Sequence, residues 1–297
     1  MMKLAAIDCG SNAVRLLVSN VFEVGEWKPL IRKADLYRVP VRLGEDAFIR
    51  GVISKEKTKD FIHAMAAFKS LMAACHVEDY LACATSAMRT AKNGHDLIKQ
   101  VHREVGLEIQ IIDGSKEAEF IALNQMDGRF LNGSFLYVDV GGGSTELSLY
   151  QDGLLKASKS FKVGTIRIKE NLVSPKRWLH MKQWIEEHCH ALTTISAIGS
   201  GGNINKLFSL TNHKNDKPVS LKRILQIHNE LSQLSLEERM LKLGLKPDRA
   251  DVIVPAGQIF TNVMTWANIQ QIFVPQIGLS DGLIHALYRR KTQAKTA

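Results

Sequence analysis

The sequence lacks any long apolar run. No window of about 18 residues is apolar enough to span a membrane, and the first residues do not form a leader with a charged segment, an apolar segment and a small-residue cleavage site. The four cysteines show neither a C-x-x-C pair nor zinc-ligand spacing, so we expect no disulfide framework and no cysteine-bound zinc. These absences predict a cytoplasmic chain with no membrane partner.

Signatures of nucleic-acid-binding modules are also missing, although the chain is basic. Lys and Arg number 39 against 30 Asp and Glu, which gives a net charge of +9. A basic surface can bind a polyanion, but without an RRM, zinc-finger or arginine-glycine-rich signature we expect no nucleic-acid partner. Much of the excess charge lies in one stretch, which is either a surface for an extended anion or a generic basic surface: Lys156, Lys159, Lys162, Arg167, Lys169, Lys176 and Arg177.

What is present is clearest in one short stretch, Val138–Leu147. Three glycines separate two β-prone runs, with Asp139 before them and Glu146 after them. A turn without side chains lets backbone N–H groups converge on an anion, and carboxylates suit a divalent cation. The stretch therefore predicts a phosphoryl-transfer site, with a glycine-rich hairpin flanked by solvated acids as the alternative. The predicted phosphate-binding residues here are Gly141, Gly142, Gly143 and Ser144, and the acids for the metal are Asp139 and Glu146.

The same layout occurs earlier in the chain. A shift of 131 residues places Asp8 on Asp139 and Gly10 on Gly141. A repeated strand–turn–strand predicts two related halves, each with a phosphate-binding loop. Cys9 lies in the first loop, where it either supplies a backbone N–H group or acts as a nucleophile. The phosphate-binding residues predicted for this loop are Asp8, Cys9, Gly10, Ser11 and Asn12.

Other candidate residues follow predicted strands at the end where α/β sheets place ligands. Arg89 offers a planar fork for phosphate oxygens, or else caps a loop at the surface. Glu117 lies in the first turn of a predicted helix. There it could deprotonate water, or its charge could only be stabilised by the helix dipole. Glu119 lies about 200° further round the helix and cannot serve the same site. In the turn Gly199–Gly202, Gly201 is a further phosphate-binding candidate.

The predicted elements follow the order β-β-β-α-β-α, twice. This order is that of the actin-like scheme, in which a ligand cleft lies between two half-domains. We expect an α/β protein with an N-terminal domain at 1–126 and a C-terminal domain at 127–297. The last helix, about 281–297, could pack back on the first domain.

Six motifs between residue 6 and about residue 282 together resemble those of the exopolyphosphatase and guanosine pentaphosphate phosphohydrolase (Ppx/GppA) family. They are Asp-x-Gly-Ser-Asn at 8–12, Val-Arg-Leu-Gly-Glu at 41–45, Ala-Thr-Ser-Ala-x-Arg-x-Ala-x-Asn at 84–93, Lys-Glu-Ala at 116–118, Asp-Val-Gly-Gly-Gly-Ser-Thr-Glu-Leu at 139–147 and Gly-Ser-Gly-Gly at 199–202. The resemblance covers nearly the whole chain and is that of the short, two-domain type.

The resemblance implies a fold of two ribonuclease-H-like domains, as in the actin/hexokinase/Hsp70 superfamily, with an interdomain cleft. It implies hydrolysis of a terminal phosphate with Mg²⁺ or Mn²⁺ as cofactor. Glu117 matches the family's general base, Arg89 its phosphate-gripping arginine, and Asp139 and Glu146 its metal-linked acids. Polyphosphate is the first expected substrate, because the sequence shows no guanine-reading signature.

Several alternatives stay open at this point. The substrate could be guanosine pentaphosphate (pppGpp), and the same fold could serve a kinase or a nucleotide sensor without turnover. A homodimer is one possible assembly. The sequence also departs from the family pattern at three places: Lys116 stands where a glutamate is usual, Ser280-Asp281 replaces Arg-Glu, and Asn203 replaces a threonine. Lys116 beside Glu117 would be expected to lower the pKa of that carboxyl.

Overall fold

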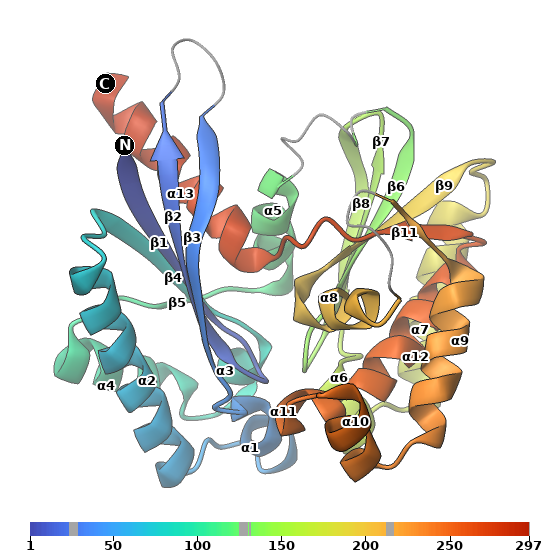
Figure 1. The fold of residues 1–297 in the computed structure, drawn as a ribbon, viewed down its shortest axis with the longest axis horizontal. Coiled ribbons are helices and arrows are strands. Elements are labelled where there is room, and N and C mark those ends of the chain that lie inside the picture. Colours follow the sequence, from blue (N-terminus) through green and yellow to red (C-terminus); the bar gives the residue numbers. More distant parts are fainter. Residues whose placement is uncertain (24–28, 125–129, 131, 212–216, 297) are drawn as a thin grey trace. The chain divides into compact units, whose positions relative to one another are not determined.

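The computed structural model describes residues 1–23, 29–124, 130, 132–211 and 217–296 (Figure 1). It forms two compact units, one made of Met1–Asn124 with Leu279–Ala297 and the other of Gln125–Gly278. The expected boundary at residues 126 and 127 lies outside the described residues. None of the described helices is both long and apolar enough to cross a membrane.

The first unit is built on a five-stranded mixed sheet with the strand order β3-β2-β1-β4-β5. Strand β1 is central, antiparallel to β2 and parallel to β4, and both its faces are buried because nearly every residue in it is apolar. The strands are β1 (Met2–Cys9), β2 (Val14–Phe22), β3 (Leu30–Val39), β4 (Asp79–Ala84) and β5 (Gln110–Ile111).

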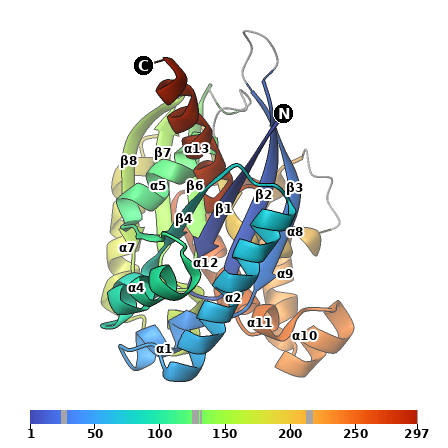
Figure 2. The ribbon, with the colours of Figure 1, turned by 90° about the vertical axis from the view of Figure 1, so that its left-hand side faces the viewer.

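Helices pack on this sheet through apolar stripes. Helix α2 is capped by the Ser54 side chain and buries Phe61, Met65 and Phe68 at helical spacing, and Figure 2 shows it lying across the strands. The final helix α13 packs on β1, β2, β4 and α5, where Leu283 and Leu287 join a cluster with Leu4. The helices are α1 (Leu43–Ile49), α2 (Lys55–Ala74), α3 (Ser86–Thr90), α4 (Gly94–Val105), α5 (Gly114–Ala122) and α13 (Leu279–Thr296).

The second unit has a six-stranded mixed sheet with the order β10-β11-β9-β6-β7-β8. Residues alternate along β6, so that Leu136, Val138 and Val140 face the helical core while Tyr137 and Asp139 face the other side. The strands are β6 (Ser134–Val140), β7 (Thr145–Gln151), β8 (Leu154–Phe161), β9 (Ile195–Ser200), β10 (Val219–Ser220) and β11 (Gln271–Phe273).

Helix α12 is the core helix of this unit. It contacts α6, α7, α8 and α9 and buries Ile259, Phe260 and Val263. The helices are α6 (Thr165–Lys169), α7 (Pro175–Cys189), α8 (Gly201–Ser209), α9 (Leu221–Gln233), α10 (Leu236–Leu243), α11 (Pro247–Ala250) and α12 (Ile253–Trp266). In both units three antiparallel strands come first and a parallel strand follows after a helix, as the repeated element order predicts.

Candidate functional site

The two predicted phosphate loops have the same backbone geometry. In the first, the N–H group of Gly10 donates to the carbonyl of Ala13 at 3.2 Å, and in the second the N–H of Gly141 donates to the carbonyl of Ser144 at 2.9 Å. These pairs are related by the 131-residue shift. The repeat seen in the sequence therefore extends to the form of the turn.

The first loop is anchored by the Val41–Glu45 motif. The backbone N–H groups of Gly44 and Arg42 donate to the carbonyls of Ser11 and Asn12, at 2.8 and 3.1 Å. Arg42 adopts a left-handed backbone with φ of 58° to begin α1. A hydroxyl pair, Ser11 and Ser86 at 2.8 Å, joins the same loop to α3.

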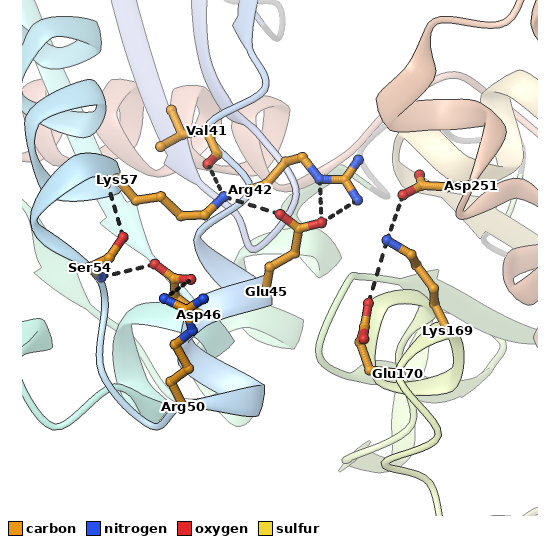
Figure 3. Close-up of polar contacts among 10 residues, drawn as sticks. All are labelled: Val41, Arg42, Glu45, Asp46, Arg50, Ser54, Lys57, Lys169, Glu170 and Asp251. Atoms are coloured by element: carbon orange, nitrogen blue, oxygen red, sulfur yellow. Dashed lines mark hydrogen bonds and ion pairs between the residues drawn. The ribbon is translucent and has the colours of Figure 1, made fainter.

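The side chains of this motif form an ion cluster within the first unit (Figure 3). Glu45 binds the guanidinium of Arg42 at 2.7 Å and the ammonium of Lys57 at 3.1 Å. Burial alone would raise the pKa of the Glu45 carboxyl, but hydrogen bonds from the two cations outweigh it and bring the pKa to about 2. The cluster therefore fixes the start of α1, which in turn holds the first loop.

The second loop is anchored by α6. The N–H groups of Thr165 and Ile166 donate to the carbonyls of Gly141 and Gly142, at 3.0 and 2.9 Å. The preceding Gly164 lies so close that an added Cβ would be 2.5 Å from the Gly142 oxygen. Only glycine allows this approach of backbone to backbone.

Two cations of the predicted anion-binding surface, Arg167 and Lys169, bind groups of the protein itself. Arg167 is buried, with 8% of its surface exposed, and its Nε donates to the carbonyl of Gly143 at 2.8 Å. Lys169 binds Asp251 at 3.0 Å and Glu170 at 3.4 Å (Figure 3). The expectation that Arg167 belongs to a surface for an extended anion is wrong, because its guanidinium is part of the loop's support.

The two predicted metal-binding acids lie directly opposite one another. Asp139 on β6 is the register partner of Glu146 on β7, so both side chains project from the same face of the sheet. Ser200 on β9 donates to the Asp139 carboxylate at 2.7 Å, and Ser160 on β8 donates to the Glu146 carboxylate at 2.7 Å. The row Ser200–Asp139–Glu146–Ser160 crosses four neighbouring strands.

This donor set fits a small hard cation. Mg²⁺ is usually held by one or two carboxylates, and water and substrate phosphates complete its shell. Asp139 and Glu146 provide two such carboxylates on adjacent strands. Across the described ranges, no group of three or more His, Cys, Asp or Glu side chains could hold an ion by itself, so substrate or water oxygens would have to complete the coordination.

The equivalent row of the first unit is different. Asp8 faces Arg15 across β1 and β2, and their side chains form an ion pair at 2.6 Å. Arg15 is the residue that the 131-residue shift places on Glu146. The first loop therefore has a carboxylate already paired with a guanidinium where the second loop has two carboxylates.

Glu117 and Arg89 both belong to the first unit. Asp113 caps α5 by accepting from the N–H of Lys116 at 2.8 Å, and this places Glu117 in the first turn of the helix. The exposed Arg89 donates to the carbonyl of Ile112, at the start of the turn that leads to α5. Arg89 thus supports the segment that carries Glu117.

The Lys116 ammonium binds Glu119 at 2.8 Å, on the outer face of α5, and also lies over the Phe120 ring. Its direct ion-pair partner is therefore Glu119. The expected lowering of the Glu117 pKa by Lys116 stays a prediction.

Buried thiols lie beneath this end of the first sheet. Burial, together with the charges of Asp8 and Glu117, raises the pKa of Cys83 to about 12. Cys83 is the register partner of Asp8, so the sheet brings Asp8 and the Glu117 turn to the same neighbourhood. Burial likewise raises the pKa of Cys9 well above its ordinary value. A thiol so held stays protonated, which favours a backbone role for Cys9 over a nucleophilic one.

The predicted Gly201 lies against Asp139. Its φ is +86°, and an added Cβ would be 2.9 Å from the Asp139 Oδ1 atom. The neighbouring Asn203 donates from Nδ2 to the carbonyl of Val140 at 2.7 Å, which ties α8 to the strand before the second loop. Asn203, at one of the departures from the family pattern, therefore has a structural partner.

The structure groups the candidate residues by unit. The second unit brings together Gly141–Ser144, Asp139, Glu146 and Gly201, and the first brings together Asp8–Asn12, Glu117 and Arg89. The sequence did not predict the roles of Ser160, Ser200 and Asn203, or the burial of Arg167. Ser200 and Asn203 lie in and beside the Gly-Ser-Gly-Gly motif, whereas nothing local marks Ser160.

Comparisons with known proteins point to one family. The model of the Ppx/GppA phosphatase family matches residues 37–291. Exopolyphosphatase 1 of Mycobacterium tuberculosis is 25% identical over 95% of this chain and 87% of its own length. The putative exopolyphosphatase of Haemophilus influenzae is 25% identical over 96% of this chain and 91% of its own length.

Solved structures show the same fold. An exopolyphosphatase from Cytophaga hutchinsonii superposes with a TM-score of 0.83 at 21% identity, over 96% of this chain and 97% of that one. The Aquifex aeolicus Ppx/GppA family member gives a TM-score of 0.76 at 22% identity, over 98% of each chain. The predicted fold class of two α/β domains is confirmed, while the expected cleft between them stays an expectation.

Proposed function

Because this chain belongs to the Ppx/GppA phosphatase family, we propose that it is an exopolyphosphatase, which hydrolyses the terminal phosphoanhydride bond of inorganic polyphosphate. The observation that carries the proposal is the pair of opposed carboxylates, Asp139 and Glu146, beside a loop of three glycines. Relatives that match most of the chain are named exopolyphosphatases.

The second loop suits the phosphate chain. The carbonyls of Gly141, Gly142 and Gly143 are occupied by α6 and Arg167. Among the described residues, no backbone hydrogen bond is donated by the amides of Gly142 and Gly143. Such amides bind phosphate oxygens in the manner of an anion nest. The first loop, with the same turn, is proposed to bind phosphate as well.

Asp139 and Glu146 are proposed to hold Mg²⁺ or Mn²⁺. The bound cation would offset negative charge on the phosphate oxygens. The serines that donate to both carboxylates hold them in the orientation seen, and this is the usual task of groups around metal ligands. The protein's contribution is then mostly positioning and electrostatics.

Glu117 is proposed to act as the general base. Its carboxylate would accept a proton from a water whose oxygen bonds to the terminal phosphorus, while the bridging P–O bond breaks and the shortened chain leaves with the bond electrons. Glu117 then returns the proton to solvent. Arg89, at the same turn, is proposed to bind a phosphate oxygen through its guanidinium.

A phosphate-release panel tests this function. The purified protein is assayed with Mg²⁺ on long polyphosphate, tripolyphosphate, pppGpp and ATP. Release that is fastest from polyphosphate supports the proposal, and release that is fastest from pppGpp makes guanosine pentaphosphate phosphohydrolase the better assignment. Turnover only with an added phosphate acceptor would indicate a kinase. Binding of pppGpp without release from any substrate would indicate a sensor.

A further inference from the structure

Arg167 is a buried arginine for which the proposed reaction has no direct use. Only 8% of its surface is exposed, and its Nε donates to the carbonyl of Gly143. A buried guanidinium is costly unless its donors are satisfied. Solubility of the protein surface therefore does not explain why this charge is buried beside the three glycines.

Arg167 completes a set of captured carbonyls. Thr165 N–H holds the Gly141 oxygen at 3.0 Å, Ile166 N–H holds the Gly142 oxygen at 2.9 Å, and Arg167 Nε holds the Gly143 oxygen at 2.8 Å. All three glycine peptides therefore direct their oxygens toward the α6 segment. The first two are fixed by backbone groups, and the third depends on the Arg167 side chain.

The direction of each carbonyl also fixes the direction of the next amide N–H, because the peptide is planar. In a trans peptide the C=O and the following N–H point in opposite directions. Oxygens directed toward α6 therefore direct the N–H groups of Gly142, Gly143 and Ser144 away from it. The first two orientations would survive loss of Arg167, but the Ser144 amide would lose its constraint.

We propose that Arg167 is a positioning residue that sets the anion-binding orientation of the loop's last amide by holding the Gly143 carbonyl. The proposal rests on the proposed function of this loop as a phosphate site. In the first unit the corresponding contacts on Ser11 and Asn12 come from backbone N–H groups, so a side-chain clamp is a feature of the second loop.

The test uses two variants of the full chain. Arg167→Lys keeps the charge but loses the planar fork that fits a carbonyl, and Arg167→Ala removes both. The matched control is Arg239→Lys, because Arg239 is half-buried and its Nε also donates to a backbone carbonyl, that of Leu231 at 2.9 Å. Each protein is measured for Tm, for the Kd of tripolyphosphate by calorimetry, and for kcat and KM on polyphosphate.

We expect both Arg167 variants to bind tripolyphosphate about 10-fold more weakly and to lose about 10²-fold in kcat/KM, the cost of a displaced binding group. Arg239→Lys should lower Tm about as much as the Arg167 variants do, and it should leave the Kd of tripolyphosphate unchanged. Added guanidinium at millimolar concentration should restore part of the Arg167→Ala activity. An unchanged Kd in folded Arg167 variants, or failure of both variants to fold, would overturn the proposal.

The two proposals fail in different ways. If the wild-type protein releases no phosphate from any anhydride, the proposed function is wrong, and the tripolyphosphate affinities still decide the role of Arg167. If wild type is an active phosphatase and the Arg167 variants match it, the clamp is wrong and the function stands.

Discussion

The two strand–turn–strand segments share a backbone and differ in charge. Gly10 and Gly141 close the same turn, and Asp8 and Asp139 take the same place before it. Across the strand, however, Asp8 meets Arg15 in an ion pair, whereas Asp139 meets Glu146. In the first row the charges of Asp8 and Arg15 cancel, whereas the second row places two carboxylates side by side. If the proposed function is right, the two copies share the anion-binding turn, and only the second copy has two adjacent carboxylates for a cation.

The largest effect is expected from Glu117, the proposed general base, which lies in the unit without the two acids proposed to bind metal. Glu117→Gln keeps the shape of the side chain and removes its basicity. Turnover on polyphosphate should fall by roughly 10²–10⁴, with binding largely retained. Glu119→Gln is the control, because Glu119 binds Lys116 on the outer face of α5. Near-normal turnover of Glu117→Gln would contradict the division of roles between the halves.

The next prediction tests whether only the second row binds metal. Asp139→Asn and Glu146→Gln each remove a proposed ligand, so the Mg²⁺ concentration for half-maximal activity should rise by about 100-fold, the upper end of the range typical of outer-shell groups. Chelation by EDTA should abolish wild-type activity. Asp8→Asn is the counterpart in the first row and should leave the metal requirement unchanged, because Asp8 is paired with Arg15. Equal effects in both rows would erase the comparison.

A smaller effect is expected from the serines of the second row. Ser160→Ala and Ser200→Ala each remove the hydroxyl that orients a carboxylate. The metal requirement should rise by roughly 10-fold, because lost outer-shell hydrogen bonds usually weaken metal binding to this extent. Ser158→Ala is matched to Ser160→Ala, since Ser158 lies on the same strand but binds Ser148 at 2.9 Å. A shift as large in Ser158→Ala would assign the effect to the sheet in general.

The smallest effect concerns stability at acid pH. It is tested by comparing a half-buried histidine of the second unit with an exposed histidine of the first. His228 on α9 packs closely on Gly257 of α12, and burial lowers its pKa from 6.5. Below that value the unfolded chain takes up a proton more readily than the folded one. The stabilising contribution is therefore complete above about pH 6.5 and is lost as the pH falls toward the folded pKa.

His228→Gln should consequently reduce the loss of Tm between about pH 7.5 and 5.5 by roughly 2–4 °C. His63→Gln removes an exposed histidine of the first unit and should leave the pH profile as it is in wild type. Parallel profiles for wild type and His228→Gln would show that this histidine is not the group that titrates.

Much of the fold follows from local signals. Strands β1, β2, β6 and β7 could be predicted because apolar β-prone runs flank turns of small residues, and α2 because Ser54 caps an apolar stripe. Helices α1 and α3 were missed. They have only seven and five residues, and α1 begins at a left-handed Arg42 whose backbone N–H donates to the distant first loop.

The candidate site was predictable where one motif contains it and not where strand pairing assembles it. Counting back from the turn at Asp152-Gly153, an unbroken hairpin would place Lys159 opposite Glu146. A bulge where the pairing passes from Leu149 to Tyr150 shifts the register by one residue, so that Ser160 takes this place. The exchange of an ammonium for a hydroxyl beside Glu146 depends on an irregularity that no local pattern announces.

Because helix α13 comes last in the chain, the first unit is completed only at the end of synthesis. Its residues complete the first unit, yet the whole second unit is encoded between α5 and α13. At the usual pace of translation, roughly 10–30 s pass between the emergence of these two helices. During that time the apolar surface around Leu4, Leu17 and Val21 has no α13 to cover it. The nascent first unit therefore lacks part of its core until α13 is made, whereas the second unit has all of its elements before the last helix leaves the ribosome.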